Sequence, residues 1–173
     1  KSEKFLKKAL SINPNNIKLL YVGRLRVEKG IFSLVSLLKR SQINLTIITS
    51  EKGNKLEDEY DNIKHISFDN YNDAIIKVYD EHSIFVLPSY TEAHPQVVDE
   101  ALARTRPVIV FKDIEHVIGD KKGIFVAERN SESFFRTINH IKENYNNIQQ
   151  EMKKNKLPTK DEFLKKFSEL ISE

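Results

Sequence analysis

Short apolar runs alternate with longer amphipathic segments along most of the chain. The apolar runs predict strands at 17–22, 43–49, 63–68, 84–87, 108–111 and 123–126. Apolar residues at helical spacing predict helices over 31–40, 72–80, 95–104 and 131–145, with a further one that reaches 154. Strands that alternate with helices are typical of parallel sheets. The pattern therefore predicts a Rossmann-like three-layer α/β/α fold with a mostly parallel sheet of about six strands.

Both ends of the chain carry an additional helical pattern. Residues 1–13 form a short amphipathic segment that ends at Asn13 and Pro14, and we interpret 1–16 as a connecting helix. After Pro158, a threonine and recurring apolar positions predict a last helix within 158–173. These two segments leave 17–157 as the single folded domain.

Composition narrows the class of protein. A length of 173 residues suits one domain with a substantial core. The absence of cysteine excludes a disulfide scaffold and a cysteine nucleophile, and it agrees with a reducing cytoplasmic setting. Since 28 basic residues stand against 25 acidic ones, and no basic stripe is interleaved with aromatics, nucleic-acid binding is poorly supported. The sequence contains no apolar run of membrane-spanning length and no visible signal peptide.

Lysines gather near both ends of the chain, at positions 4, 7, 8, 153, 154, 156, 160, 165 and 166. Such lysines are usually the solvated faces of helices. Because several stand beside Phe and Leu, the alternative is peripheral contact with an anionic membrane surface.

The segment from Ser89 to Glu100 carries two carboxylates around the start of a helix. It follows a buried strand at 84–87, so Glu92 falls in the loop and Glu100 inside the helix. In open parallel sheets, ligands bind at the carboxyl ends of the strands, and a helix N-terminus there favours phosphate. We expect both glutamates to reach one bound molecule.

A second block, from Val22 to Gly30, places basic residues in the first strand-to-helix loop. Arg24 offers a planar fork and Lys29 a compact charge for phosphate oxygens, close to backbone amides. The alternative is a solvated basic loop, and for Arg26 both interpretations remain open. No spacing of acidic and histidine residues predicts a metal site.

The two blocks together resemble a known family. Glu92, seven residues and Glu100, followed by Ala-Leu-Ala and Pro107-Val-Ile-Val, is similar to the donor site of retaining GT-B glycosyltransferases of family 4 type (glycosyl transferases group 1). The resemblance covers roughly residues 17 to 127 and implies the C-terminal, donor-binding half of such an enzyme. It also implies a UDP-, GDP- or ADP-sugar donor, a glycan or lipid-linked acceptor, and no cofactor or metal.

This resemblance also implies a setting. Because the chain begins with lysine, we expect a fragment whose acceptor-binding half lies upstream. Such a fragment would bind nucleotide without turnover. Bacterial polysaccharide or lipopolysaccharide biosynthesis, in the cytoplasm or at the inner face of the cytoplasmic membrane, is the setting that the resemblance suggests.

Residue roles follow from the resemblance position by position. Arg24 and Lys29 would hold the diphosphate, Glu92 would lie near the donor sugar, and Glu100 would bind the ribose hydroxyls. Arg24, Lys29 and Glu92 are therefore the candidate catalytic residues. The complete donor-binding set is Gly23, Arg24, Lys29, Glu92, His94, Gln96, Val97, Val98 and Glu100. His94 could equally cap or pack, and Glu115 matches a family glutamate of less uniform role.

Several positions depart from the family pattern, and other functions stay open. Ala93 and Thr105 stand where the family has glycine, and Lys112-Asp113-Ile114 replaces a glycine pair, so the donor-sugar pocket should differ in shape. The alternatives are half of a GT-B sugar-nucleotide 2-epimerase or a non-catalytic nucleotide-binding module. A dinucleotide-binding domain is disfavoured because the Gly-x-Gly-x-x-Gly motif is missing.

Overall fold

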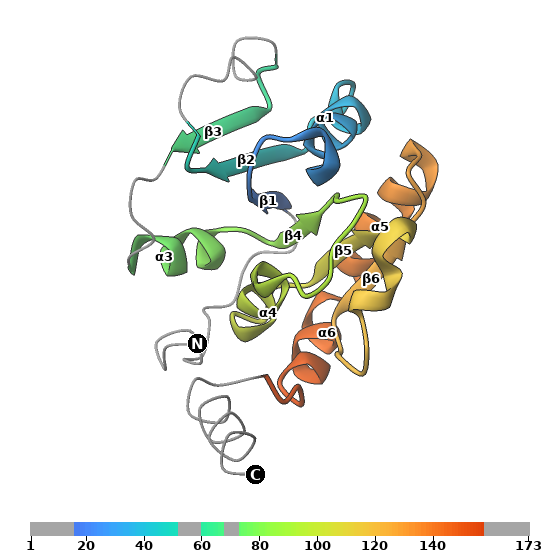
Figure 1. Cartoon of the computed structure of the whole chain (residues 1–173). Coiled ribbons are helices and arrows are strands. Elements are labelled where there is room, and N and C mark those ends of the chain that lie inside the picture. Colours follow the sequence, from blue (N-terminus) through green and yellow to red (C-terminus); the bar gives the residue numbers. More distant parts are fainter. Residues whose placement is uncertain (1–15, 52–59, 68–72, 158–173) are drawn as a thin grey trace.

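A computed structural model describes residues 16–51, 60–67 and 73–157. In this part of the chain one parallel sheet has the strand order β3-β2-β1-β4-β5-β6 (Figure 1). Its strands are β1 (Lys18–Val22), β2 (Asn44–Thr49), β3 (Ile63–Ser67), β4 (Ile84–Leu87), β5 (Val108–Phe111) and β6 (Ile124–Ala127). Every neighbouring pair is parallel. The predicted strands are therefore confirmed to within one residue at each end.

Helices connect the strands. They are η2 (Val27–Lys29), α1 (Ile31–Leu38), α3 (Asp73–Glu81), α4 (Gln96–Ala103), η3 (Lys112–Val117), α5 (Ser131–Glu143) and α6 (Tyr145–Met152). The prediction missed the two 3₁₀ helices η2 and η3. It also continued one helix to 145, whereas α5 ends at Glu143 and Asn144 separates it from α6. The predicted helices at 1–13 and within 158–173 lie outside the described residues.

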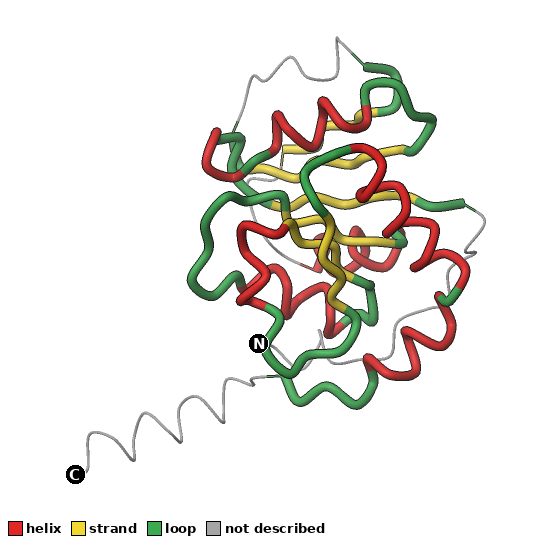
Figure 2. Tube along the Cα trace, turned by 90° about the vertical axis from the view of Figure 1, so that its right-hand side faces the viewer, coloured by secondary structure: helices red, strands yellow, loops and turns green. Residues whose placement is uncertain are grey.

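Alternating side chains of the strands build a separate core on each face of the sheet. Leu19 and Tyr21 of β1 are buried in one core, which includes residues of α1 and α5. Leu20 and Val22 are buried in the other, which includes residues of α3 and α4. Figure 2 shows the strands side by side with helices on either side of them. Burial on both faces explains the continuous apolar runs of β4 and β5, whereas the edge strand β3 contains Lys64 and His65 and is only partly buried.

Thr105 adopts a left-handed backbone between α4 and β5. Its φ is 53°, and it is the one non-glycine residue with positive φ among the described residues. Its carbonyl accepts a hydrogen bond from Gln149 Nε2 at 2.9 Å, which ties this turn to α6. The family glycine expected at this position thus has a physical reason, and threonine occupies the same conformation at an energetic cost.

The sheet order reverses between β1 and β4. Strands β2 and β3 follow β1 toward one edge, whereas β5 and β6 follow β4 toward the other. Loops that leave β1 and β4 therefore diverge and open a crevice at the carboxyl ends of these strands. Among the residues described, no helix combines the length and apolar character needed to cross a bilayer.

Candidate functional site

An open pocket of about 310 Å³ lies at the reversal of strand order. It is lined by Tyr21, Val22, Gly23, Arg24, Lys29, Ser50, Leu87, Glu92, His94, Pro95, Gln96 and Val97. These residues come from the ends of β1, β2 and β4, from η2, and from the start of α4. The two sequence blocks predicted to form a site thus meet in one pocket.

A short ion pair joins the two blocks inside this pocket. Lys29 Nζ lies 2.7 Å from Glu92 Oε1, and the same oxygen accepts a hydrogen bond from Ser89 Oγ at 2.7 Å. The exposed fractions of the Lys29 and Glu92 side chains are 24% and 12%. The backbone is held as well, because His116 Nε2 lies 2.7 Å from the Glu92 carbonyl oxygen. Partial burial makes such a pair stronger than one on an open surface.

Gly30 lets the turn that carries Lys29 approach the loop that carries Glu92. Its φ is 67°, and a Cβ on this residue would lie 1.9 Å from the Pro88 carbonyl oxygen. No side chain fits at that distance. The loop after β1 is fixed on its other side, where Leu25 N–H donates to Glu51 Oε2 at 2.8 Å. The placement of Lys29 therefore depends on a glycine in a crowded turn with positive φ.

Arg24 and Arg26 differ in what they face. Arg24 lines the pocket with an exposed side chain, and its carbonyl accepts a hydrogen bond from Tyr21 Oη at 2.7 Å. Arg26 does not line the pocket and lies 3.9 Å from Glu28 and 4.0 Å from Glu51. Arg24 therefore lies where the predicted ligand would bind. Arg26, whose role was open, lies on the solvated outside of the loop with a side chain that is 52% exposed.

The N-terminus of α4 faces the pocket with its first two residues. Gln96 and Val97 line the pocket, with Pro95 as the residue before the helix. Val98 is buried, and its N–H already donates to the Pro95 carbonyl at 3.1 Å. The first helical turn therefore engages the Val98 amide, one of the three amides expected to face a ligand.

Glu100 lies one helical turn after Gln96, on the same side of α4. Its Oε2 accepts a hydrogen bond from Tyr79 Oη at 3.1 Å. Tyr79 belongs to α3 and is fully buried. Glu100 is not among the residues that line this pocket.

His94 lines the pocket beside a buried carboxylate. Its Nε2 lies 3.5 Å from Asp99 Oδ2, and Lys121 Nζ lies 3.0 Å from Asp99 Oδ1. Asp99 is only 1% exposed, whereas the His94 ring is 66% exposed. The ring can thus face a ligand while Asp99 orients it. Glu115 is exposed, pairs with Lys112 at 3.6 Å, and lies outside the pocket lining.

Sequence reasoning missed four residues around the site: Ser50, Ser89, His116 and Arg129. Ser50 lines the pocket, Ser89 bonds Glu92, and His116 holds the Glu92 backbone. Arg129 Nη1 donates to the Pro88 carbonyl at 2.9 Å. Ser89 lies only three residues before Glu92, so its position in the sequence could have identified it as a partner of that glutamate. The others come from distant segments, and no nearby motif marks them.

The charges of the site suit an anion with hydroxyl groups. Arg24, Lys29 and the start of α4 supply positive potential, while Glu92 offers acceptor oxygens to hydroxyl donors. Within the described ranges, no three acidic or histidine side chains gather as a metal site would require. The arrangement can therefore bind a phosphorylated, hydroxyl-rich ligand.

Solved structures share this fold. Sucrose-phosphate synthase of Thermosynechococcus elongatus has 18% identity and a TM-score of 0.74, over 93% of this chain and 46% of that one. HepE of Anabaena, in complex with UDP and glucose, has 16% identity and a TM-score of 0.65, over 80% and 42%. The C-terminal domain of LpcC from Francisella tularensis, a group 1 family glycosyl transferase, has 19% identity and a TM-score of 0.61, over 80% and 81%.

The chain thus spans less than half the length of the first two proteins. No curated protein matches its sequence. The model of the family described as glycosyl transferases group 1 matches residues 2–157, which include every strand and helix described above. The chain belongs to the group 1 glycosyltransferases.

Proposed function

We propose that this chain is the donor-binding domain of a retaining glycosyltransferase. The enzyme would move a sugar from a nucleoside-diphosphate sugar to a glycan or lipid-linked acceptor, as in bacterial polysaccharide or lipopolysaccharide assembly. The observation that carries the proposal is the pocket at the β1–β4 reversal, where Lys29, Arg24 and Glu92 meet. HepE, a structural neighbour with the same fold, is solved with UDP and glucose.

The chemistry requires stabilisation of a leaving diphosphate. When the bond between the anomeric carbon and the phosphate oxygen breaks, negative charge develops on the diphosphate. Lys29, Arg24 and the start of α4 are the groups that would stabilise it. No metal or cofactor is needed in this scheme.

The remaining polar groups would contact the sugar and the ribose. Glu92 would orient hydroxyls of the donor sugar next to the developing positive charge at the anomeric carbon. Glu100 would accept hydrogen bonds from the ribose, because it lies one helical turn beyond Gln96, which lines the pocket. For this role the Glu100 carboxylate must share its bond to Tyr79 with the ribose.

Acceptor binding is proposed to come from a second domain. This chain spans 46% of sucrose-phosphate synthase and 42% of HepE, so the shared fold leaves more than half of those proteins unmatched. A second domain that closes over the pocket would exclude water and bring the acceptor to the donor sugar. The present chain alone should therefore bind nucleotide without turning over.

Calorimetric titration with UDP, GDP and ADP tests the proposal. We expect one diphosphate to bind with micromolar to millimolar affinity, and Lys29→Ala and Glu100→Ala to weaken it about tenfold or more, since each removes a charged contact. Matched controls are Lys77→Ala and Glu151→Ala, whose side chains are exposed and do not line the pocket. Equal losses in the controls, or no binding to any diphosphate by the folded protein, would contradict the proposal.

A further inference from the structure

Arg129, in the loop after β6, bonds segments from three other parts of the chain. Its Nη1 donates to Ser33 Oγ at 2.8 Å and to the Pro88 carbonyl at 2.9 Å. Its Nη2 donates to the Ser89 carbonyl at 3.3 Å and to Asp113 Oδ2 at 2.6 Å, and Nε reaches the same Asp113 oxygen at 3.2 Å. One guanidinium thus joins α1, the β4–α4 loop and η3.

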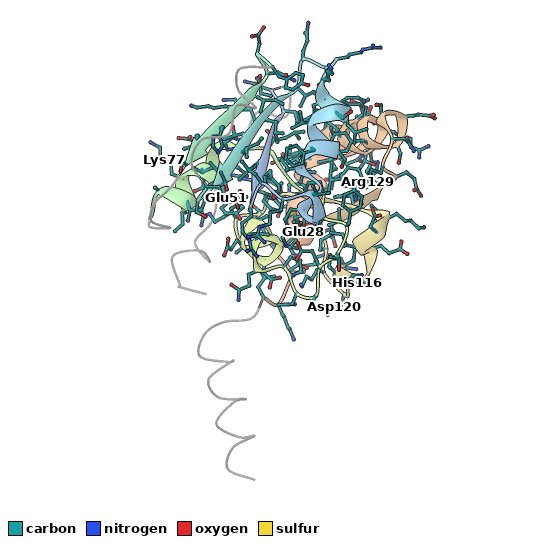
Figure 3. The ribbon with its side chains drawn as sticks, turned by 45° about the horizontal axis from the view of Figure 1, so that its top comes forward. Glu28, Glu51, Lys77, His116, Asp120 and Arg129 are labelled. Carbon is teal, nitrogen blue, oxygen red and sulfur yellow. The ribbon has the colours of Figure 1, made fainter. Side chains whose placement is uncertain are left out.

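The guanidinium also lies between two aromatic rings. Its central carbon is 3.9 Å from the centroid of Tyr90 and 4.5 Å from that of Phe111. The Arg129 side chain, labelled in Figure 3, is only 19% exposed. A planar, delocalised cation can stack on two rings and still donate five hydrogen bonds, whereas a lysine ammonium cannot. The contacts at position 129 therefore favour arginine over lysine.

These contacts reach the turn that carries Lys29. Ser33 Oγ accepts from Arg129 and donates to the Gly30 carbonyl at 2.8 Å. A Cβ on Gly30 would lie 3.3 Å from Arg129 Nη1 and 1.9 Å from the Pro88 carbonyl oxygen. The turn, the loop and the guanidinium are thus packed against one another without space for a side chain.

The same contacts reach Glu92. Arg129 holds the carbonyls of Pro88 and Ser89, and Ser89 Oγ donates to Glu92 Oε1 at 2.7 Å. One residue further on, Tyr90 N–H donates to the Glu28 carbonyl of η2 at 3.0 Å. Arg129 therefore contacts, through Ser33 and Ser89, the two segments that carry Lys29 and Glu92. It does not line the pocket itself.

We propose that Arg129 is a positioning residue: it fixes the β4–α4 loop against the η2–α1 turn and so sets the distance between Glu92 and Lys29. The consequence for ligand affinity rests on the proposed function, because it assumes that Lys29 binds a diphosphate. The consequence for the loop itself does not. An arginine outside the pocket thus controls the geometry of the groups inside it.

Amide exchange measured by NMR on the ligand-free protein tests the loop directly. In Arg129→Lys we expect the Tyr90 amide, bonded to Glu28, to exchange about tenfold faster, which corresponds to a local opening made easier by that factor. The Phe85 amide, which bonds the Pro107 carbonyl at 2.9 Å inside the sheet, should not change. Unchanged exchange at Tyr90 would overturn the proposal.

Binding is measured in parallel, well below the unfolding temperature, with whichever of UDP, GDP and ADP the unaltered protein binds. Arg129→Lys should weaken it on the order of tenfold, because small displacements of binding groups are costly. Ser33→Ala, a milder change in the same network, should act in the same direction. The matched control is Arg104→Lys, which breaks the bidentate pair with Asp80 at 2.6 and 2.8 Å. Arg104→Lys should lower the melting temperature but leave the exchange rate of the Tyr90 amide and the affinity for the diphosphate unchanged.

The outcomes separate the two proposals. If the unaltered protein binds a diphosphate and folded Arg129→Lys binds it equally well, the positioning role is wrong and the proposed function stands. If no diphosphate binds to the unaltered protein, the proposed function fails. The exchange of Tyr90 then still decides whether Arg129 holds the loop.

Discussion

Lys29 and Glu92, 63 residues apart in the sequence, meet at 2.7 Å in the pocket between β1 and β4. The positive charge of Lys29 and the negative charge of Glu92 offset each other, and both side chains are mostly buried. A phosphate that binds Lys29 must therefore compete with the Glu92 carboxylate for the ammonium group. The pair that assembles the site also opposes its occupation by an anion alone.

Glu92→Gln should raise the affinity for a nucleoside diphosphate. The amide keeps the size of the side chain but no longer offers Lys29 a negative charge, so an incoming phosphate gains the full interaction. We expect a gain of about threefold to tenfold, the range of a partly screened charge pair. Calorimetry on both proteins measures it. Weaker binding by the variant would show that Glu92 does not compete for Lys29.

Gly30→Ala should destabilise the protein by about 2 kcal/mol or more. The new methyl group would lie 1.9 Å from the Pro88 carbonyl oxygen, and the backbone must also keep a φ of 67°. Urea unfolding measures the loss. Gly119→Ala is a matched control, since its φ is 55° and a Cβ there meets nothing within 4 Å. It should cost about 1 kcal/mol, the conformational part alone. Equal losses in the two variants would mean that the Pro88 contact is unimportant.

Thr105→Gly should stabilise the protein. Glycine adopts the φ of 53° without the steric cost of a Cβ, while it adds entropy to the unfolded chain. The relief of the steric cost exceeds the entropy added to the unfolded chain, so we expect a gain of about 0.5–1 kcal/mol in the free energy of unfolding. Thr105→Ala keeps the Cβ and should show no such gain. A loss of stability in the glycine variant would indicate that the contact of Gln149 Nε2 with Thr105 Oγ1 at 3.4 Å outweighs the strain.

Stability should fall at acidic pH in part through His82. Its Nδ1 lies 2.6 Å from the Val78 carbonyl and its Nε2 2.7 Å from Thr46 Oγ1, and burial lowers the pKa of this histidine. Below pH 6.5, the ordinary histidine value, the unfolded chain binds a proton more readily than the folded one. The stability contributed by neutral His82 is therefore lost as the pH falls through and below that value.

The measurement is urea unfolding at pH 7.5 and pH 5.5, with conditions otherwise equal. His82→Gln removes the titrating group and should lose less stability between these two pH values than the unaltered protein does. His140→Gln changes an exposed histidine and should leave the pH dependence as it is. An unchanged pH dependence in His82→Gln would rule out this role for His82.

The alternation of apolar runs and amphipathic segments was enough to predict the parallel sheet, because a strand buried on both faces must be apolar throughout. It also placed Glu92 in a loop and Glu100 in a helix, as observed. The 3₁₀ helices η2 and η3 were missed, since such short turns have no periodic pattern. The end of α5 at Glu143 was missed for a similar reason: the apolar pattern continues into α6, and only the backbone at Asn144 separates the two.

Residue types and their order along the chain determined which two loops could carry phosphate chemistry. Only the tertiary structure decided which side chains meet. It pairs Lys29 with Glu92, turns Glu100 toward Tyr79, engages the Val98 amide in its own helix, and brings Arg129 behind the site. The physical reason is that periodicity reports each segment's own burial. Contacts between loops depend on the strand order and on close approaches such as that of Gly30 to Pro88, which local patterns do not encode.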